Sequence, residues 1–172
     1  MSIYLIAIAL LNPVTWLIKP ADAVFQDVQR IRVEVLPRKA ETEGAGKTYQ
    51  LKSDASVRVI IRNDTDQRVK ALVFDKYYQN RPRLFKDGKL VPYRETVKKL
   101  VAAEDNDPEF VSTVSGVFIA PHSSREIGGL SLSDWYGPLQ PGSYELTNRY
   151  RLTVEGPWTA DSPELRFEIK VE

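Results

Sequence analysis

Aromatic and arginine side chains of the types that form recognition surfaces gather in three parts of the sequence. Flat rings stack on sugars and peptides, and Trp, Tyr and Arg dominate the energetics of many protein interfaces. The candidate binding residues are Tyr77, Tyr78, Arg81, Arg83, Trp135, Tyr136 and Trp158. The simpler interpretation, which we favour, is that these rings fill the core and close loops. Tyr77 and Tyr78 are the better candidates for exposure, because one of two neighbours in a strand must point outward.

The remaining residues give little indication of a catalytic site. His122 is the only histidine, and it lies in the turn 120–124. A catalytic histidine needs a nucleophile and an orienting carboxylate within hydrogen-bond reach. Ser123 and Ser124 are adjacent to it but cannot easily face it, and neither a Gly-x-Ser-x-Gly motif nor a cysteine occurs. We therefore expect no catalytic residues and a protein that is not an enzyme.

A cluster of acidic residues raises the question of a metal site. Glu104, Asp105, Asp107 and Glu109 offer oxygen ligands of the kind that calcium takes. The stretch lacks the loop glycine and the ligand spacing of an EF-hand, so a solvated acidic turn is the simpler interpretation and a weak calcium site the alternative. One histidine and no cysteine exclude multi-histidine zinc or copper sites. No cofactor and no metal are expected.

The charge balance limits the kinds of partner. The chain has 24 Lys+Arg and 23 Asp+Glu, so its formal net charge of +1 gives no general attraction to nucleic acid or to an anionic membrane. We expect the partner to be another protein or a cell-envelope glycan.

Residues 1–23 have the pattern of a signal peptide. An unbroken apolar run extends from Ile3 to Leu11, and Ala21 and Ala23 form an Ala-x-Ala cleavage signature, although no Lys or Arg precedes the run. An uncleaved signal-anchor and a buried N-terminal element are the alternatives. The apolar stretch ends at Ile18, short of the roughly 20 residues that span a bilayer. Cleavage predicts a secreted or periplasmic protein, while retention predicts a membrane anchor through this segment alone.

Alternation of apolar and polar residues predicts that residues 24–172 form a single domain of β-strands. An antiparallel sheet with one face in water produces this period of two. In the segment 143–154 Asn148 falls on the apolar side, which predicts either a hydrogen-bond partner or a bend. Strands are expected at 28–36, 48–52, 56–62, 69–75, 83–86, 89–93, 110–119, 125–132, 143–154 and 164–171.

Three local signals refine this strand pattern. Asp87-Gly88 between apolar flanks predicts a tight hairpin, because both central residues of a type I′ turn need positive φ. Gly128-Gly129 inside a strand predicts a bulge or a close approach of backbone. Residues 94–109 have weak helical periodicity and read as a helical or loop insertion over the surface, where binding functions often lie.

Residues 130–146 carry a resemblance to a known class of domain. A strand leads into a short helical turn, and Leu-x-Pro-Gly-x-Tyr-x-Leu then opens the next strand. This arrangement resembles bacterial secreted immunoglobulin-like or fibronectin-III-like β-sandwich domains, and it is distantly similar to the proteinase-inhibitor-like β-sandwich family of bacilli. The resemblance implies an all-β, antiparallel immunoglobulin-like sandwich. It also implies a tyrosine corner, in which the hydroxyl of Tyr144 or Tyr136 bonds nearby backbone.

The sequence therefore predicts a non-catalytic binding or interaction module of the cell envelope. A protease inhibitor that presents a loop, implied by the resemblance, and an aromatic-surface carbohydrate binder are the alternatives. An open edge strand would favour strand addition to a partner. Coplanar exposed rings at Tyr77, Trp135 or Trp158 would favour sugar binding.

Overall fold

The computed structural model describes residues 29–38, 42–43, 48–73, 75–106, 115–154 and 156–170. The predicted signal segment, residues 1–23, lies outside the described residues. The strands are β1 (Ile31–Pro37), β2 (Thr42–Glu43), β3 (Thr48–Leu51), β4 (Ser56–Asn63), β5 (Val69–Val73), β6 (Arg83–Lys86), β7 (Lys89–Val91), β8 (Ser115–Ile119), β9 (Ser123–Ser131), β10 (Gly142–Thr147) and β11 (Leu165–Ile169). The helices are α2 (Lys76–Gln79), α3 (Glu95–Asn106) and α4 (Leu132–Tyr136).

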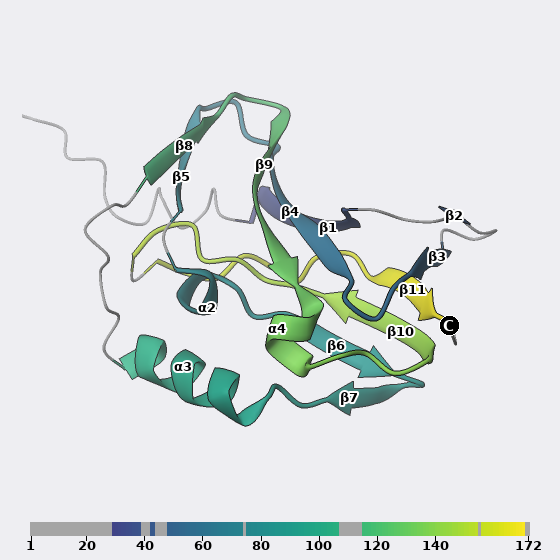
Figure 1. Ribbon diagram of the computed structural model, residues 1–172. Helices are drawn as coiled ribbons and strands as arrows, with labels where there is room; N and C mark the ends of the chain where they lie inside the picture. The colour runs from purple at the N-terminus through teal and green to yellow at the C-terminus, as the bar shows by residue number, and fades with distance from the viewer. Residues whose placement is uncertain are drawn as a thin grey trace, which may run out of the picture.

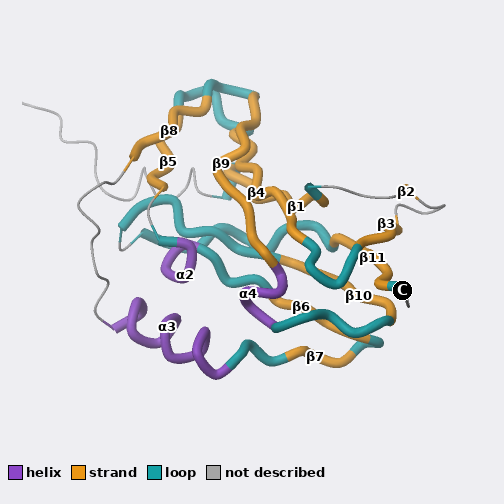
Figure 2. Tube along the Cα trace, in the orientation of Figure 1, coloured by secondary structure: helices purple, strands orange, loops and turns teal. Residues whose placement is uncertain are grey.

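The strands form two larger sheets and one ribbon (Figure 1). A three-stranded sheet has the order β1-β4-β9, a six-stranded sheet has the order β2-β3-β11-β10-β6-β7, and β5 pairs with β8 alone. Among the described strands each pairing is antiparallel except that of β11 with β3. The expected all-β, mainly antiparallel fold is confirmed. Figure 2 shows that the helices lie on one side of the molecule, with the β5–β8 ribbon projecting above them.

One hydrophobic core draws side chains from both larger sheets. Buried and partly exposed residues alternate along β4 and β11, so each strand turns one face to the core. Burying a side chain such as Phe167 in this way contributes about 1.5–3 kcal/mol relative to leaving it in water. The ring of Tyr144 stacks on Phe167 with centroids 5.2 Å apart, and its hydroxyl donates to the Gln140 carbonyl at 2.6 Å. The backbone bond expected of Tyr144 is thus present.

The structure confirms the predicted hairpin, bulge and helical insertion, each of which depends on residues close together in the sequence. Asp87 and Gly88 have φ of 48° and 76°, as the hairpin between β6 and β7 requires. The pairing of β4 with β9 shifts register between Val59 and Ile60, opposite Gly128, which confirms a bulge there. The expected insertion at 94–109 contains helix α3, and none of the described helices is long and apolar enough to cross a membrane.

The predicted strand 69–75 is confirmed over Val69–Val73, but the expectation that Tyr77 and Tyr78 have strand geometry is wrong. Strand β5 ends at Val73, and Asp75 caps helix α2 by accepting hydrogen bonds from the backbone N–H groups of Tyr77 at 2.6 Å and Tyr78 at 3.0 Å. An aspartate side chain satisfies the free N–H groups at a helix start, which stabilises the helical turn over an extended chain. Tyr78 is consequently buried and Tyr77 only partly exposed.

The expected strand 143–154 is shorter than predicted. Strand β10 ends at Thr147, and only single bridges follow, between Asn80 and Tyr150 and between Arg151 and Trp158. Asn148 is fully buried, donates to the side-chain oxygen of Asn80 at 2.9 Å, and so has the predicted hydrogen-bond partner. Side-chain alternation nevertheless continues past the end of the ladder, because Tyr150 and Leu152 are also buried.

Candidate functional site

The structure separates the predicted binding residues into two groups, each built around a tryptophan. We call the first the aromatic cluster; its members are Tyr77, Tyr93, Trp135 and Tyr136. We call the second the arginine cluster; its members are Arg81, Arg149, Arg151 and Trp158. Arg83 flanks the arginine cluster, and Tyr78 lies beneath Arg151 with the guanidinium carbon 4.3 Å from its ring centroid.

The aromatic cluster is part of the core. The ring of Trp135 is 5.1 Å from that of Tyr77 and 5.2 Å from that of Tyr93, at angles of 54° and 63°. Tilted and edge-on contacts of this kind are the favoured packing of buried rings. Trp135 has no exposed surface, so it cannot offer a face to a sugar. The described structure therefore lacks the coplanar exposed rings at Tyr77 and Trp135 that would favour sugar binding, and Trp135 instead fits the core interpretation.

Two hydroxyl groups attach the aromatic cluster to the start of β6. Tyr93 and Tyr136 both donate to the carbonyl oxygen of Pro82, at 2.6 Å and 2.8 Å. Burial raises the pKa of Tyr93 to about 12 and raises the pKa of Tyr136 further, so both groups are neutral donors at ordinary pH. The role of the cluster is to hold this carbonyl, and Arg81 and Arg83 on either side of it, in place.

The arginine cluster places three cations around one ring. The guanidinium carbons of Arg81, Arg149 and Arg151 lie 4.7, 4.9 and 4.4 Å from the centroid of the Trp158 ring. Each such contact is worth about 0.5–1 kcal/mol at an exposed site. Three like charges so close together repel one another, so the cluster attracts anions.

Backbone hydrogen bonds bring these residues together from three segments. Arg81 N–H donates to the Arg149 carbonyl at 3.2 Å, which sets the segment before β6 beside the continuation of β10. Thr159 N–H donates to the Tyr150 carbonyl at 2.9 Å and Tyr150 N–H to the Thr159 hydroxyl at 2.9 Å, which places Trp158 beside Arg151. The arginines are thus held on a fixed backbone.

Two carboxylates partly offset these cations. Asp105, in the last turn of α3, contacts Arg81 and lies 3.7 Å from Arg151. A negative side chain there opposes the helix dipole, and the two arginines compensate for it. Asp161 pairs with Arg83. Arg149 is exposed and its contact within the described residues is with Trp158.

Arg81 is the most buried arginine of the cluster, and its surroundings show how the positive charge is held. Arg81 is 8% exposed, and burial lowers its pKa while Asp105 acts against that shift. Its Nη1 donates to the carbonyls of Tyr77 and, at 2.7 Å, Asn80. The Nε of Arg151 is also buried, and it has no hydrogen-bond partner among the described residues. The described part of the cluster and its flank hold four guanidinium groups against two carboxylates, an excess of positive charge on a nearly neutral chain.

Sequence reasoning found Arg81, Arg83 and Trp158 but missed Arg149 and Arg151. The signal was present, because both occupy the solvent side of the predicted strand 143–154, two positions apart. Asp105, one of the candidate calcium ligands, lies against two arginines in the structure. No three acidic or histidine side chains converge on a metal position within the described residues, and Asp107 and Glu109 lie outside them.

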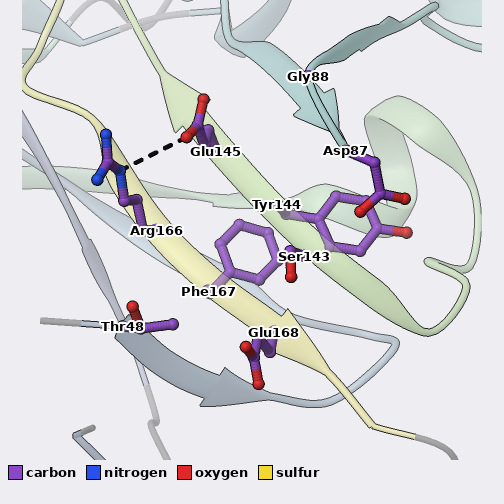
Figure 3. Close-up of a pocket in the computed structure, with 9 residues that line it drawn as sticks. All are labelled: Thr48, Asp87, Gly88, Ser143, Tyr144, Glu145, Arg166, Phe167 and Glu168. Carbon is purple, nitrogen blue, oxygen red and sulfur yellow. Dashed lines mark ion pairs between the residues drawn. The ribbon is translucent and has the colours of Figure 1, made fainter. Parts of the chain in front are cut away.

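Two other polar regions are weaker candidates for a binding site. A cavity of about 180 Å³ on β10 and β11 has Asp87, Glu145, Arg166 and Glu168 as the charged residues of its lining (Figure 3), and Arg166 lies 3.5 Å from Glu145. The exposed ring of His122 lies 2.8 Å from Asp66, while the Ser123 hydroxyl donates to the Ala120 carbonyl at 2.8 Å. The three carboxylates that line the cavity outnumber its one guanidinium group, so this region attracts cations, whereas the arginine cluster attracts anions.

Comparison with known proteins adds no family. No protein-family model matches the sequence, and none of the curated proteins matches it significantly. Function is therefore inferred from the chemistry of the arginine cluster.

Proposed function

We propose that this chain is a non-catalytic binding module of the cell envelope, and that it binds an acidic partner protein through the arginine cluster and Arg83. The observation that carries the proposal is the excess of guanidinium groups around Trp158. Arginine and tryptophan are the residue types most enriched among interface hot spots, and guanidinium groups bind carboxylates in two-point contacts. Concentrated positive charge also speeds encounter with an acidic partner.

An immunoglobulin-like arrangement of the two larger sheets is part of the same proposal. The bond from the Tyr144 hydroxyl to Gln140, four residues upstream, supports it, as does the core shared by both sheets. Domains of this architecture commonly bind partners through their loops and sheet edges. The arginine cluster lies where β10 gives way to such connecting chain.

The carbohydrate-binding alternative has weaker support. Trp135 is buried, and the Trp158 ring is already in contact with three guanidinium groups. A sugar would need a free ring face, whereas a carboxylate needs only the guanidinium edges. The protease-inhibitor alternative has no specific observation in its favour.

Export through residues 1–23 is tested by mass spectrometry of the protein recovered from outside the cytoplasm. We expect chains that begin after Ala23. Chains that retain Met1 would contradict cleavage.

Binding is tested with the full chain and fluorescent poly-L-glutamate, with poly-L-lysine as the reversed-charge reference. We expect saturable binding of poly-L-glutamate and no saturable binding of poly-L-lysine. Arg149→Glu should weaken it at least about tenfold, because one charge-assisted hydrogen bond to a carboxylate is worth about 1.5 kcal/mol or more. Arg125→Glu makes the same charge change on β9, at another exposed arginine, and should leave the affinity within about twofold. Equal loss in both variants, or no binding by the wild type, would overturn the proposal.

A further inference from the structure

An apolar cavity lies beside the arginine cluster. It has a volume of about 240 Å³ and is lined by Pro82, Arg83, Leu90, Val91, Pro92 and Tyr93. Leu90, in β7, is 60% exposed, more than either of the other two large exposed apolar residues described. An apolar side chain left in water next to an apolar hollow is typical of a surface that a partner covers.

Two residues belong to both the cavity and the charged surface. Arg83 lines the cavity and pairs with Asp161. Tyr93 lines it too, and the charges of Arg81, Arg149 and Arg83 all act on its hydroxyl to lower its pKa against the larger effect of burial. The cavity and the arginine cluster are therefore neighbouring parts of one surface.

The strand register gives the spacing between charge and cavity. Phe85 pairs with Leu90 across β6 and β7, and Arg83 precedes Phe85 by two positions. Alternation along a strand then puts Arg83 and Leu90 on the same face. Two residues along a strand span about 7 Å and neighbouring strands are about 5 Å apart, so the two backbone positions are about 8 Å apart, or two to three residues of extended chain.

The position of β7 favours an extended occupant. It is the last strand of the six-stranded sheet, paired with β6 on one side and with no described strand on the other. Such an edge accepts an extended segment through backbone hydrogen bonds.

We propose that the partner of the arginine cluster presents an extended protein segment in which carboxylates lie two or three residues from one large apolar side chain. The carboxylates contact Arg149 and Arg83, and the apolar side chain enters the cavity beside Leu90. This inference rests on the proposed function and adds the spacing of carboxylates and apolar side chain that the site selects in its partner. An anionic glycan would supply the charge but no large apolar side chain.

The inference is tested by fluorescence anisotropy on the full chain with three synthetic peptides. The first has Leu two residues from a Glu-Glu pair, the second has Ser in place of Leu, and the third has Leu moved eight residues away. We expect the first peptide to bind about tenfold more tightly than the other two, as burial of most of a leucine side chain allows.

Variants assign the effect to the cavity. Leu90→Ser should reduce the advantage of the first peptide to about threefold or less, since it removes one apolar wall. Phe118→Ser changes another exposed apolar residue, on the β5–β8 ribbon that projects from the rest of the molecule in Figure 1, and should leave the advantage intact. Thermal melting of both variants confirms that they fold.

The outcomes separate the inference from the proposed function. If the three peptides bind equally well and Arg149→Glu weakens their binding, the inference is overturned but the proposed function stands. Tighter binding of polygalacturonate than of any peptide would overturn the inference in favour of a glycan. Absence of binding by every acidic probe would overturn both.

Discussion

Trp135 and Trp158 are the same residue type in opposite settings. Trp135 is fully buried, and its neighbours are tyrosine rings. Trp158 is partly exposed, and its neighbours are three guanidinium groups. The first arrangement gains stability from apolar burial, whereas the second holds like charges together on a rigid support. The environment of an aromatic ring thus decides whether the ring supports the fold or displays charge.

The largest expected effect is the loss of protein stability when Trp135 of the aromatic cluster is replaced. Trp135→Ala should lower the free energy of unfolding by about 3–5 kcal/mol, because it leaves a cavity in the core. Trp158→Ala should lower it by about 1.5–3 kcal/mol, mainly through the loss of three cation–π contacts. Urea denaturation measures both.

A conservative change sharpens that test. The indole N–H of Trp135 has no hydrogen-bond partner within the described part of the chain, so Trp135→Phe gives up volume but no hydrogen bond and should be milder than Trp135→Ala. If Trp158→Ala destabilises the protein as much as Trp135→Ala does, the proposed division between the two clusters fails.

Alkaline pH should also act on the aromatic cluster. The folded-state pKa of Tyr93 is raised to about 12, above the ordinary value of 10.0. Its contribution to stability is therefore complete below pH 10 and is lost as the pH rises towards 12. We expect a fall of about 2 kcal/mol in the free energy of unfolding over this range from Tyr93. Denaturation of the wild type and of Tyr93→Phe at several pH values measures it, and an equally steep fall in the variant would contradict this assignment.

Asp105 should have opposite effects on stability and on binding. Asp105→Asn should lower the free energy of unfolding by about 1 kcal/mol, because nearly buried Arg81 loses its anion. The same change should strengthen binding of poly-L-glutamate severalfold, since it removes an internal competitor. Asp161→Asn, which frees the exposed Arg83, is the matched control. It should change stability by less than about 0.5 kcal/mol. Weaker binding by Asp105→Asn would show that this carboxylate orders the site rather than occupying it.

The smallest expected effect is that of Arg149 on stability. Arg149→Glu should change the free energy of unfolding by no more than about 0.5 kcal/mol, because the side chain is exposed. Urea denaturation beside the poly-L-glutamate assay measures both properties on one sample. A loss of stability as large as that of Trp158→Ala would mean that the weakened binding reflects unfolding.

Local sequence signals predicted most strands because their causes are local. The hairpin at Asp87-Gly88 needs only residues that tolerate positive φ, and alternation in β4 and β11 needs only one buried face. The error at Tyr77 and Tyr78 arose where two local signals competed, because the cap from Asp75 outweighed the extended pattern before it. The same cap could have been noticed, since aspartate is a common first residue of helices.

The candidate site could be predicted only in part. The alternation of the segment 143–154 places Arg149 and Arg151 in solvent, but nothing local indicates that Arg81 and Trp158 lie against them. Those contacts depend on backbone hydrogen bonds between Arg81 and Arg149 and between Tyr150 and Thr159.

Neighbouring residues alone account for the β-strand character, the hairpin, the bulge and the helical insertion, because each follows from their sizes, charges and backbone freedom. Long-range packing, by contrast, buries Trp135 rather than Trp158 and brings arginines from distant segments together around Trp158. Burial and the summing of charge depend on which distant segments pack together, and that choice is made by the whole core at once.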